Sequence, residues 1–299
     1  MTTHFADRLL EAIATKGSPV CVGLDPVYER LPEKIRKKFA GDFAGQAEAV
    51  KTFCLTLLEL VAPYVPAVKP QSAYFEMYGW LGVAAYEECV AKAHDLGLVV
   101  IGDVKRNDIG STAAAYAQGH LNNGPGSPDS VTVNGYLGSD GIKPFLSQAT
   151  PAGKGLFVLV RTSNPSAREL QDLVTQGGGR KVYEHVADLV ASLGAGSVGA
   201  SGYSNVGAVV GATYPDEARA LRELMPQQIF LVPGYGAQGG TAADAAASFK
   251  DGTGAIVNAS RSVIFAYNEK PCAGTDWKQA IDLAAREFAN DIAAATGHK

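Results

Sequence analysis

Short apolar runs recur along the chain, and most are followed by a segment in which apolar residues have helical spacing. We predict a β-strand at each of eight runs: residues 19–25, 64–70, 98–105, 130–136, 155–162, 206–213, 229–235 and 254–260. The runs are continuous rather than alternating, which indicates strands buried on both faces, as in a parallel sheet. Eight such strands with intervening helices predict an α/β protein, a single (β/α)8 TIM barrel domain over residues 1–299.

An open, doubly wound sheet is the competing fold. It would normally carry a G-x-G-x-x-G turn after its first strand, and the segment GLDPVYERLP at that point has no such spacing. The glycine-rich segment TQGGGRKVYEH, residues 175–185, lies within the barrel repeat and could serve as the hinge of a lid.

Composition and charge exclude several classes of protein. The net charge of −4 argues against a nucleic-acid or membrane-surface protein, and the basic run EKIRKKFAGD is interleaved with acidic residues, as on a solvated helix face. No stretch approaches 18 apolar residues, and Asp7 and Glu11 interrupt the amphipathic N-terminal helix, which leaves no apolar signal-peptide core. We therefore expect a cytoplasmic protein.

The cysteines and histidines suggest neither a disulfide framework nor a metal site. The cysteines are scattered without a C-x-x-C pair, at Cys21, Cys54, Cys89 and Cys272, so we expect free thiols in a reducing cytosol. The five histidines form no cluster with metal-ligand spacing. We expect no metal.

Charged residues gather where the first three predicted strands end, which is where barrel enzymes place their active sites. Asp25 ends the first strand and Lys69 the second, and the third carries Asp103 and Lys105, with Asp108 just beyond. Residues two apart on a strand point the same way, so Asp103 and Lys105 should share one face. Alternating charges would keep the lysines protonated, which favours a general acid over a Schiff-base nucleophile.

The last two strands end in segments suited to a phosphate. Barrels often bind phosphate with the loops after strands seven and eight. Here strand seven ends at Pro233 and leads into the glycine-rich PGYGAQGGTAAD, which contains Gln238, and strand eight leads to Arg261. Glycines, helix-start amides and an arginine all favour a phosphomonoester. After strand five, Ser163 or Asn164 could cap a helix, and Ser163 could also reach the ligand; the two roles are not exclusive.

Taken together, these segments resemble orotidine 5′-phosphate decarboxylase. GDVKRNDIGST resembles the D-x-K-x-x-D-I signature of that family, and CVGLDP, AVKPQSAYFE, PGYGAQGG and NASRSVI resemble its other strand-end motifs in the same order. The resemblance runs from about Val20 to Tyr267. VTVNGYLG and VRTSNPS resemble the longer bacterial, type 2 branch, although Gly135 replaces the proline usual there.

The resemblance implies a cofactor-independent conversion of orotidine 5′-monophosphate to uridine 5′-monophosphate, a step of pyrimidine biosynthesis. It implies that Lys105 protonates C6 as carbon dioxide leaves and that Asp103 lies beside the substrate carboxylate. Lys69 and Asp108 would complete the charged network. The remaining implied roles are ribose binding by Lys69 and Asp25, base binding by Ser163, and phosphate binding by Gln238 and Arg261.

The resemblance also implies a homodimer in which Asp108, with Ile109 and Thr112, reaches the partner's active site. Three alternatives stay open on the sequence: a Mg²⁺-dependent barrel such as 3-keto-L-gulonate 6-phosphate decarboxylase, a Schiff-base aldolase, and a non-catalytic nucleotide-binding barrel. The first would carry an acid at the end of strand two, where this chain has Lys69. The second would need a lysine that titrates near neutrality.

Overall fold

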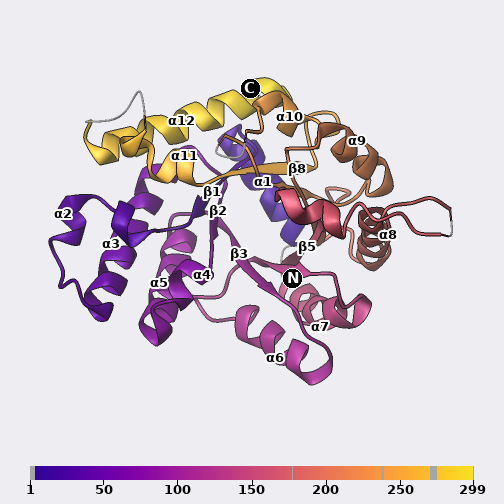
Figure 1. The fold of residues 1–299 in the computed structure, drawn as a ribbon, viewed down its shortest axis with the longest axis horizontal. Coiled ribbons are helices and arrows are strands. Elements are labelled where there is room, and N and C mark those ends of the chain that lie inside the picture. The colour runs from indigo at the N-terminus through magenta and orange to yellow at the C-terminus, as the bar shows by residue number, and fades with distance from the viewer. Residues whose placement is uncertain (1–3, 177, 237–238, 270–274, 299) are drawn as a thin grey trace.

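Eight parallel strands close into a barrel in sequence order in the computed structural model of this chain, with β8 paired to β1 (Figure 1). The structure describes residues 4–176, 178–236, 239–269 and 275–298. The strands are β1 (Val20–Leu24), β2 (Ala67–Pro70), β3 (Val99–Arg106), β4 (Ser130–Asn134), β5 (Gly155–Arg161), β6 (Val206–Val210), β7 (Phe230–Val232) and β8 (Ala255–Ala259). The predicted (β/α)8 barrel is therefore confirmed.

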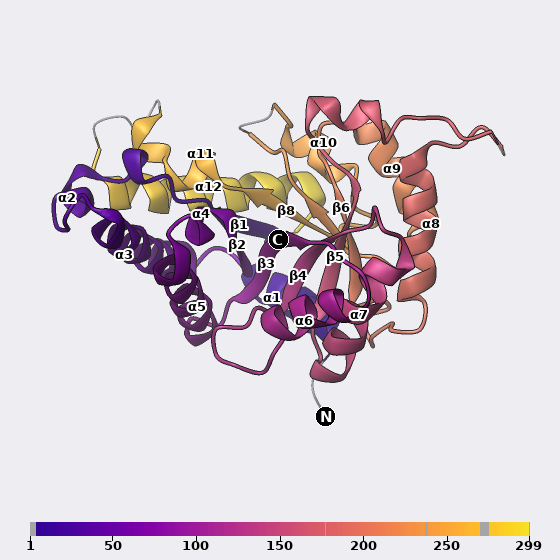
Figure 2. The same cartoon turned by 60° about the horizontal axis from the view of Figure 1, so that its bottom comes forward.

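Helices surround the ring of strands, as the two views of the ribbon show (Figures 1 and 2). They are α1 (Phe5–Lys16), α2 (Glu33–Arg36), α3 (Phe43–Val61), α4 (Ala73–Glu76), α5 (Gly79–Asp95), α6 (Gly110–His120), α7 (Ser139–Ala149), α8 (Val182–Gly194), α9 (Pro215–Leu224), α10 (Ala242–Ala246), α11 (Arg261–Ile264) and α12 (Trp277–Thr296). Short 3-10 helices lie at Tyr28–Arg30, Thr150–Ala152, Pro165–Glu169 and Ala266–Asn268. No helix in the described part of the chain is long and apolar enough to cross a membrane.

The strands are buried on both faces, which explains their continuous apolar sequence. On β1, Val20 and Val22 belong to the large cluster between barrel and helices, whereas Cys21 belongs to a second cluster of inward-facing side chains. Helix α1 contributes Phe5 and Leu9 to that inner cluster, so it closes the amino-terminal end of the barrel. At the opposite, carboxyl-terminal end, polar residues follow several of the strands, among them Asp25 after β1, Gln71 after β2 and Thr162 after β5.

Strand β3 departs from regular geometry just where its charged residues stand. Its register against β4 shifts between Gly102 and Arg106. Lys105 has a φ of 45°, in the left-handed region that non-glycine residues rarely adopt. The sequence-based expectation that the Asp103 and Lys105 side chains share a face assumed a regular strand. The direction of the Lys105 side chain relative to that of Asp103 therefore depends on this bulge.

The glycine-rich segment after β5 forms a projecting arm. Val174 pairs antiparallel with Lys181, and the amide of Thr175 donates to the carbonyl of Arg180 at 2.9 Å. The ribbon places this arm on the outside of the barrel beside α8 (Figure 1). A hinge in this segment would move the projecting arm. The role of this arm as a lid stays a prediction.

Candidate active site

Two lysines hold one buried carboxylate between them at the carboxyl-terminal end of the barrel. The ammonium of Lys69, from β2, donates to Oδ2 of Asp103 at 2.6 Å, and that of Lys105 donates to Oδ1 of the same carboxylate. Lys69 and Asp103 are each 5% exposed, whereas the side chain of Lys105 is 45% exposed. The bulge in β3 thus still brings Asp103 and Lys105 together, and it leaves the Lys105 ammonium facing open space.

Two neutral side chains that the sequence analysis missed complete the surroundings of Asp103. Gln71, just after β2, donates to Oδ2 at 3.0 Å, and Thr132, on β4, donates to Oδ1 at 2.9 Å. The Thr132 hydroxyl also accepts from the amide of Lys105 at 3.0 Å. Thr132 lies two residues before Asn134, so inward alternation along strand four was the one signal that could have indicated it.

Charge pairing keeps the buried members of this cluster ionised. Burial would raise the pKa of Asp103, but the positive charges of Lys69 and Lys105 hold it well below its usual range. Burial would likewise lower the pKa of Lys69, but the negative charges of Asp103 and Asp25 raise it above the ordinary lysine value. Lys69 is therefore a fixed cation at neutral pH, as expected from the sequence.

A cavity of about 730 Å³ opens above this cluster. That volume is in the usual range for sites that enclose a small-molecule ligand. Its walls include seven of the residues predicted from the sequence: Asp25, Lys69, Asp103, Lys105, Ser163, Pro233 and Arg261. Gln238 lies outside the described residues.

The end of β1 packs closely against the segment after β8, which brings Asp25 close to the start of α11. A Cβ atom on Gly23 would lie 1.9 Å from the hydroxyl of Ser260, so a larger residue there would require the Ser260 side chain to move. Ser260 and Arg261 also line the cavity. Oδ1 of Asp25 is buried without a hydrogen-bond partner among the described residues, so an acceptor is available at this wall.

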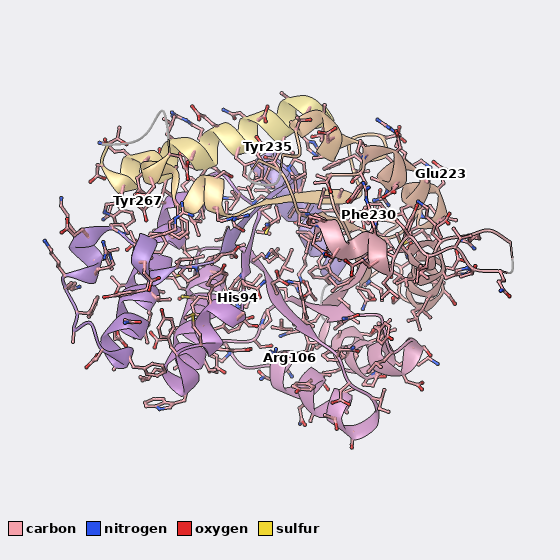
Figure 3. The ribbon with its side chains drawn as sticks, viewed as in Figure 1. His94, Arg106, Glu223, Phe230, Tyr235 and Tyr267 are labelled. Carbon is pink, nitrogen blue, oxygen red and sulfur yellow. The ribbon has the colours of Figure 1, made fainter. Side chains whose placement is uncertain are left out.

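The loop after β7 is anchored to the last helix. The Tyr235 ring lies 4.9 Å from that of Phe288, and its hydroxyl donates to Asp291 at 2.5 Å; Figure 3 shows Tyr235 beside α12. Thr241 and Asp244 cap the start of the next helix reciprocally, which occupies their own two amides. Phosphate binding by this loop and by Arg261 stays a prediction.

The loop after β5 rests on a buried arginine that the sequence analysis did not single out. Arg161 is fully buried; its Nε donates to Glu217 at 2.7 Å, and its guanidinium lies 4.3 Å from the ring centre of Tyr214. Gln171 accepts from the amide of Thr162 at 3.0 Å, which folds the loop back over the strand end. The sequence of β5, apolar with one arginine at its end, does not indicate that this arginine pairs with residues as distant along the chain as Tyr214 and Glu217.

Ser163 is held at the cavity wall by a close approach to β6. A Cβ atom on Gly211 would lie 3.0 Å from Cβ of Ser163. The residue at the start of the following 3-10 helix is Asn164, and its side chain makes no capping hydrogen bond; it accepts instead from the Thr162 hydroxyl at 2.7 Å. Of the two roles predicted for Ser163, lining the ligand cavity is the one this geometry favours.

Three predicted site residues do not line the cavity of their own chain. Asp108 accepts a hydrogen bond from the amide of Ile109 at 2.8 Å, and Ile109 is 55% exposed. Thr112 lines a different cavity, between α5 and α6.

Comparison with known proteins decides the family. Residues 18–273 match the model of the Orotidine 5′-phosphate decarboxylase / HUMPS family. The chain belongs to this family. An orotidine 5′-phosphate decarboxylase of Rhodopirellula baltica is 43% identical over 94% of this chain and 96% of its own, and one of Clostridium acetobutylicum is 37% identical over 96% and 98%.

Solved structures agree with the family assignment. A crystal structure from Streptomyces avermitilis that carries the orotidine 5′-phosphate decarboxylase name has a TM-score of 0.82 and 36% identity, covering 99% of this chain and 96% of its own. A Leishmania donovani structure described as an OMP decarboxylase has a TM-score of 0.76 and 33% identity, covering 99% of this chain and 100% of its own. The resemblance predicted from GDVKRNDIGST is confirmed, and these relatives do not support the three alternatives.

Proposed function

We propose that this chain, acting as one barrel domain, decarboxylates orotidine 5′-monophosphate to uridine 5′-monophosphate and carbon dioxide through Lys105. The observation that carries the proposal is the Lys69–Asp103–Lys105 cluster at the floor of a cavity whose wall also includes Arg261. The names of the Rhodopirellula baltica and Clostridium acetobutylicum relatives supply the substrate.

The phosphate, ribose and base of the substrate would bind at successive positions along the cavity. Arg261, which is exposed at the start of α11, would pair with the 5′-phosphate together with Gln238. The free acceptor of Asp25 and the ammonium of Lys69 would bind ribose hydroxyls. Ser163 would hydrogen-bond the base. With the two ends fixed, C6 of the pyrimidine would lie above Asp103 and Lys105.

The reaction requires the site to stabilise negative charge at C6 of the pyrimidine. When carbon dioxide leaves, the C6 carbanion gains little delocalisation from the pyrimidine ring. An ammonium held in place before the reaction stabilises that charge without reorganisation and can then donate its proton to C6. Asp103 would hold the Lys105 ammonium near C6 and would lie beside the departing carboxylate. No electron-sink cofactor enters this scheme.

Lys69 also bears on the metal-dependent alternative. A buried, charged ammonium 2.6 Å from Asp103 repels a divalent cation from the place where a magnesium site would need an acid. The proposed reaction is therefore metal-independent.

We further propose that the working enzyme is a cytoplasmic homodimer with shared sites. Asp108 and Ile109 stand at the surface, outside the cavity that holds Lys105 of their own chain. Both residues lie on the loop that directly follows β3, and the 55% exposure of Ile109 leaves this loop accessible to a second copy. In this arrangement Asp108 of each copy would enter the other's site, with Ile109 and Thr112 beside it.

The test is direct. Protein treated with EDTA should consume orotidine 5′-monophosphate, followed by loss of its ultraviolet absorbance, at the same rate as untreated protein. Uridine 5′-monophosphate should be formed in equal amount. Complete dependence on added Mg²⁺, or no turnover by folded protein, would contradict the proposal.

A further inference from the structure

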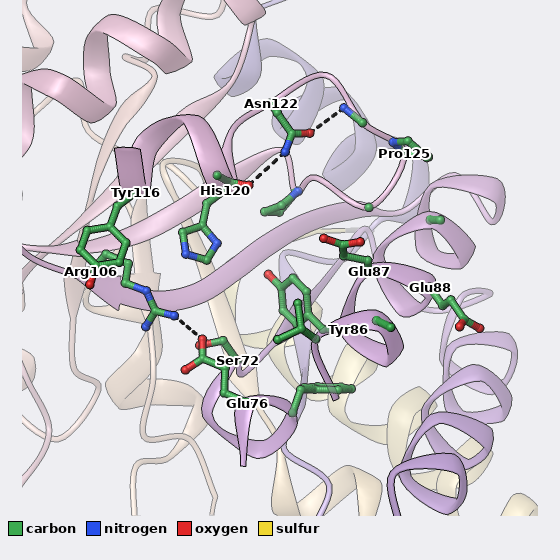
Figure 4. A pocket seen from close by; sticks show the side chains of 18 of the residues that line it. Ser72, Glu76, Tyr86, Glu87, Glu88, Arg106, Tyr116, His120, Asn122 and Pro125 are labelled. Atoms are coloured by element: carbon green, nitrogen blue, oxygen red, sulfur yellow. Dashed lines mark hydrogen bonds and ion pairs between the residues drawn. The ribbon is translucent and has the colours of Figure 1, made fainter. Parts of the chain in front are cut away.

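The residue after Lys105 points to the opposite side of the barrel wall. Arg106 lines a second cavity, of about 940 Å³, between α5 and α6. Figure 3 places Arg106 in that region, and Figure 4 shows its guanidinium beside Glu76, with Tyr116 close by. This cavity is separate from the one that holds the lysine–aspartate cluster, with β3 between them.

Arg106 connects three elements around the bulge. Nη1 of the guanidinium donates to the carbonyl of Val104 at 3.1 Å, and Nη2 donates to the carboxylate of Glu76, the last residue of α4. The guanidinium also lies 5.6 Å from the ring centre of Tyr116, on α6. A single side chain therefore fastens the backbone of β3 to both neighbouring helices.

The bulge that Arg106 holds is the one that aims Lys105. Lys105 adopts its strained φ of 45° between Val104 and Arg106, and such conformations persist only where surrounding contacts fix them. From inside the barrel, the Thr132 hydroxyl fixes the Lys105 amide at 3.0 Å. From outside, Arg106 fixes the carbonyl of Val104, one residue away. The strained residue is held on both sides.

We propose that Arg106, oriented by Glu76, is a positioning residue for Lys105: by holding the Val104 carbonyl it keeps the bulge that directs the Lys105 ammonium at Asp103 and the substrate. The proposal rests on the proposed function for its catalytic readout. A surface ion pair with no such role would contribute little to stability and nothing to the chemical step.

The main test is Arg106→Met, which keeps the length of the side chain and removes its donors. We expect kcat to fall about 10- to 100-fold, since displacement of a catalytic group by about 1 Å costs that much, while KM changes less than about threefold. Lys92→Met is the matched control, because it breaks a partly exposed ion pair between Lys92 on α5 and Glu59 on α3. A kcat within twofold of wild type, or a loss carried by KM alone, would overturn the proposal.

A double-mutant cycle tests the part played by Glu76. Glu76→Gln leaves Arg106 in place but removes the charge that orients it, so kcat should fall by a smaller factor than in Arg106→Met. The double variant should be no worse than Arg106→Met, because both changes act through one interaction. Losses that multiply would show that Glu76 does not act through Arg106.

A readout that needs no substrate separates this proposal from the proposed function. The modification rate of the Lys105 amine by an acylating reagent, followed by mass spectrometry, should rise several-fold in Arg106→Met as the ammonium leaves Asp103. Lys143, exposed on α7, serves as the internal reference. Unchanged Lys105 reactivity overturns the positioning role even if wild type fails to decarboxylate. If Arg106→Met does not fold, Glu76→Gln replaces it in this measurement, and unchanged Lys105 reactivity there overturns the positioning role equally.

Discussion

Asp103 accepts hydrogen bonds from four side chains, two of them cationic, while almost fully buried. Such a carboxylate is held in one orientation, and it holds both lysines in turn. The neutral donors Gln71 and Thr132 matter here because each uses a lone pair that would otherwise be left unpaired. The arrangement fixes the positions of charges in advance, which is what electrostatic catalysis needs.

Lys105→Ala should abolish turnover. Removal of the proposed proton donor and its charge should lower kcat at least about 10³-fold. Asp103 would keep Lys69, Gln71 and Thr132 as partners, so circular dichroism should show an unchanged fold. Steady-state kinetics beside Lys143→Ala, a matched change on the exposed face of α7, provides the measurement. Activity within tenfold of wild type would assign the proton donor elsewhere.

At this scale the sequence predicted the charged residues well and their neutral partners poorly. Asp103, Lys105 and Lys69 stand out because charges at the end of a buried apolar run are unusual. Thr132 does not, because threonine is an ordinary strand residue. Arg161 was missed because its partners follow after a long loop whose path no local pattern indicates.

Among the elements, β3 shows where a sequence pattern stops being sufficient. Its apolar run predicts a buried strand correctly, but regular alternation does not predict the bulge at Lys105. The bulge depends on contacts from Thr132 on β4 and Glu76 on α4, which are tertiary. Most predicted strands also extend beyond the observed ones. At several carboxyl ends the surplus residues leave the sheet and line the cavity, as Thr162, Pro233 and Ser260 do.

The amino-terminal end of the barrel is tied together by Asp129, just before β4. Its carboxylate accepts from Arg8 of α1 at 2.6 Å and from the amide of Val100 at 2.8 Å, and it lies 3.1 Å from the ring of His94. Burial would raise its pKa, but the His94 contact, the Arg8 charge and the Val100 amide lower it to about 2.

Asp129→Asn should therefore destabilise the protein in a pH-dependent way. A carboxyl with a pKa near 2 when folded and near 3.8 when unfolded stabilises the fold by about 2 kcal/mol at neutral pH. This stability is present above about pH 4 and is lost as pH falls towards 2, about half of it by pH 3. Urea denaturation at pH 7 and pH 3 measures the gap between wild type and variant.

The exposed Asp95, at the end of α5, is the control for that experiment. Asp95→Asn should change the free energy of unfolding by less than about 0.5 kcal/mol at either pH. If the gap for Asp129→Asn were as large at pH 3 as at pH 7, ionisation of Asp129 would not be its source.

At the scale of the whole molecule, the number of strands and their burial predicted the barrel. Neither of them predicts how copies of the chain assemble. The proposed sharing of sites gives a quantitative test by subunit mixing. Lys105→Ala and Asp108→Ala proteins, each nearly inactive alone, should recover activity when mixed. Random exchange would leave about a quarter of all sites intact, since half the dimers are mixed and each has one wild-type site.

A second mixture supplies the control. Lys105 and Lys69 line the same cavity of one chain, so Lys105→Ala mixed with Lys69→Ala should recover nothing. Subunit exchange is checked independently with differently tagged chains. Exchange without recovery in the first mixture would place Asp108 outside the partner's site.

The buried lysine–aspartate cluster also has a consequence for how this protein can change. Buried ion pairs stabilise folds little, and apolar replacements of similar volume are often neutral or stabilising. Under the proposed function, Lys69 and Asp103 serve the chemistry rather than thermal stability. Variants selected for heat tolerance alone would tend to lose this ion pair early. Variants that must also support pyrimidine synthesis would have to gain stability at other positions.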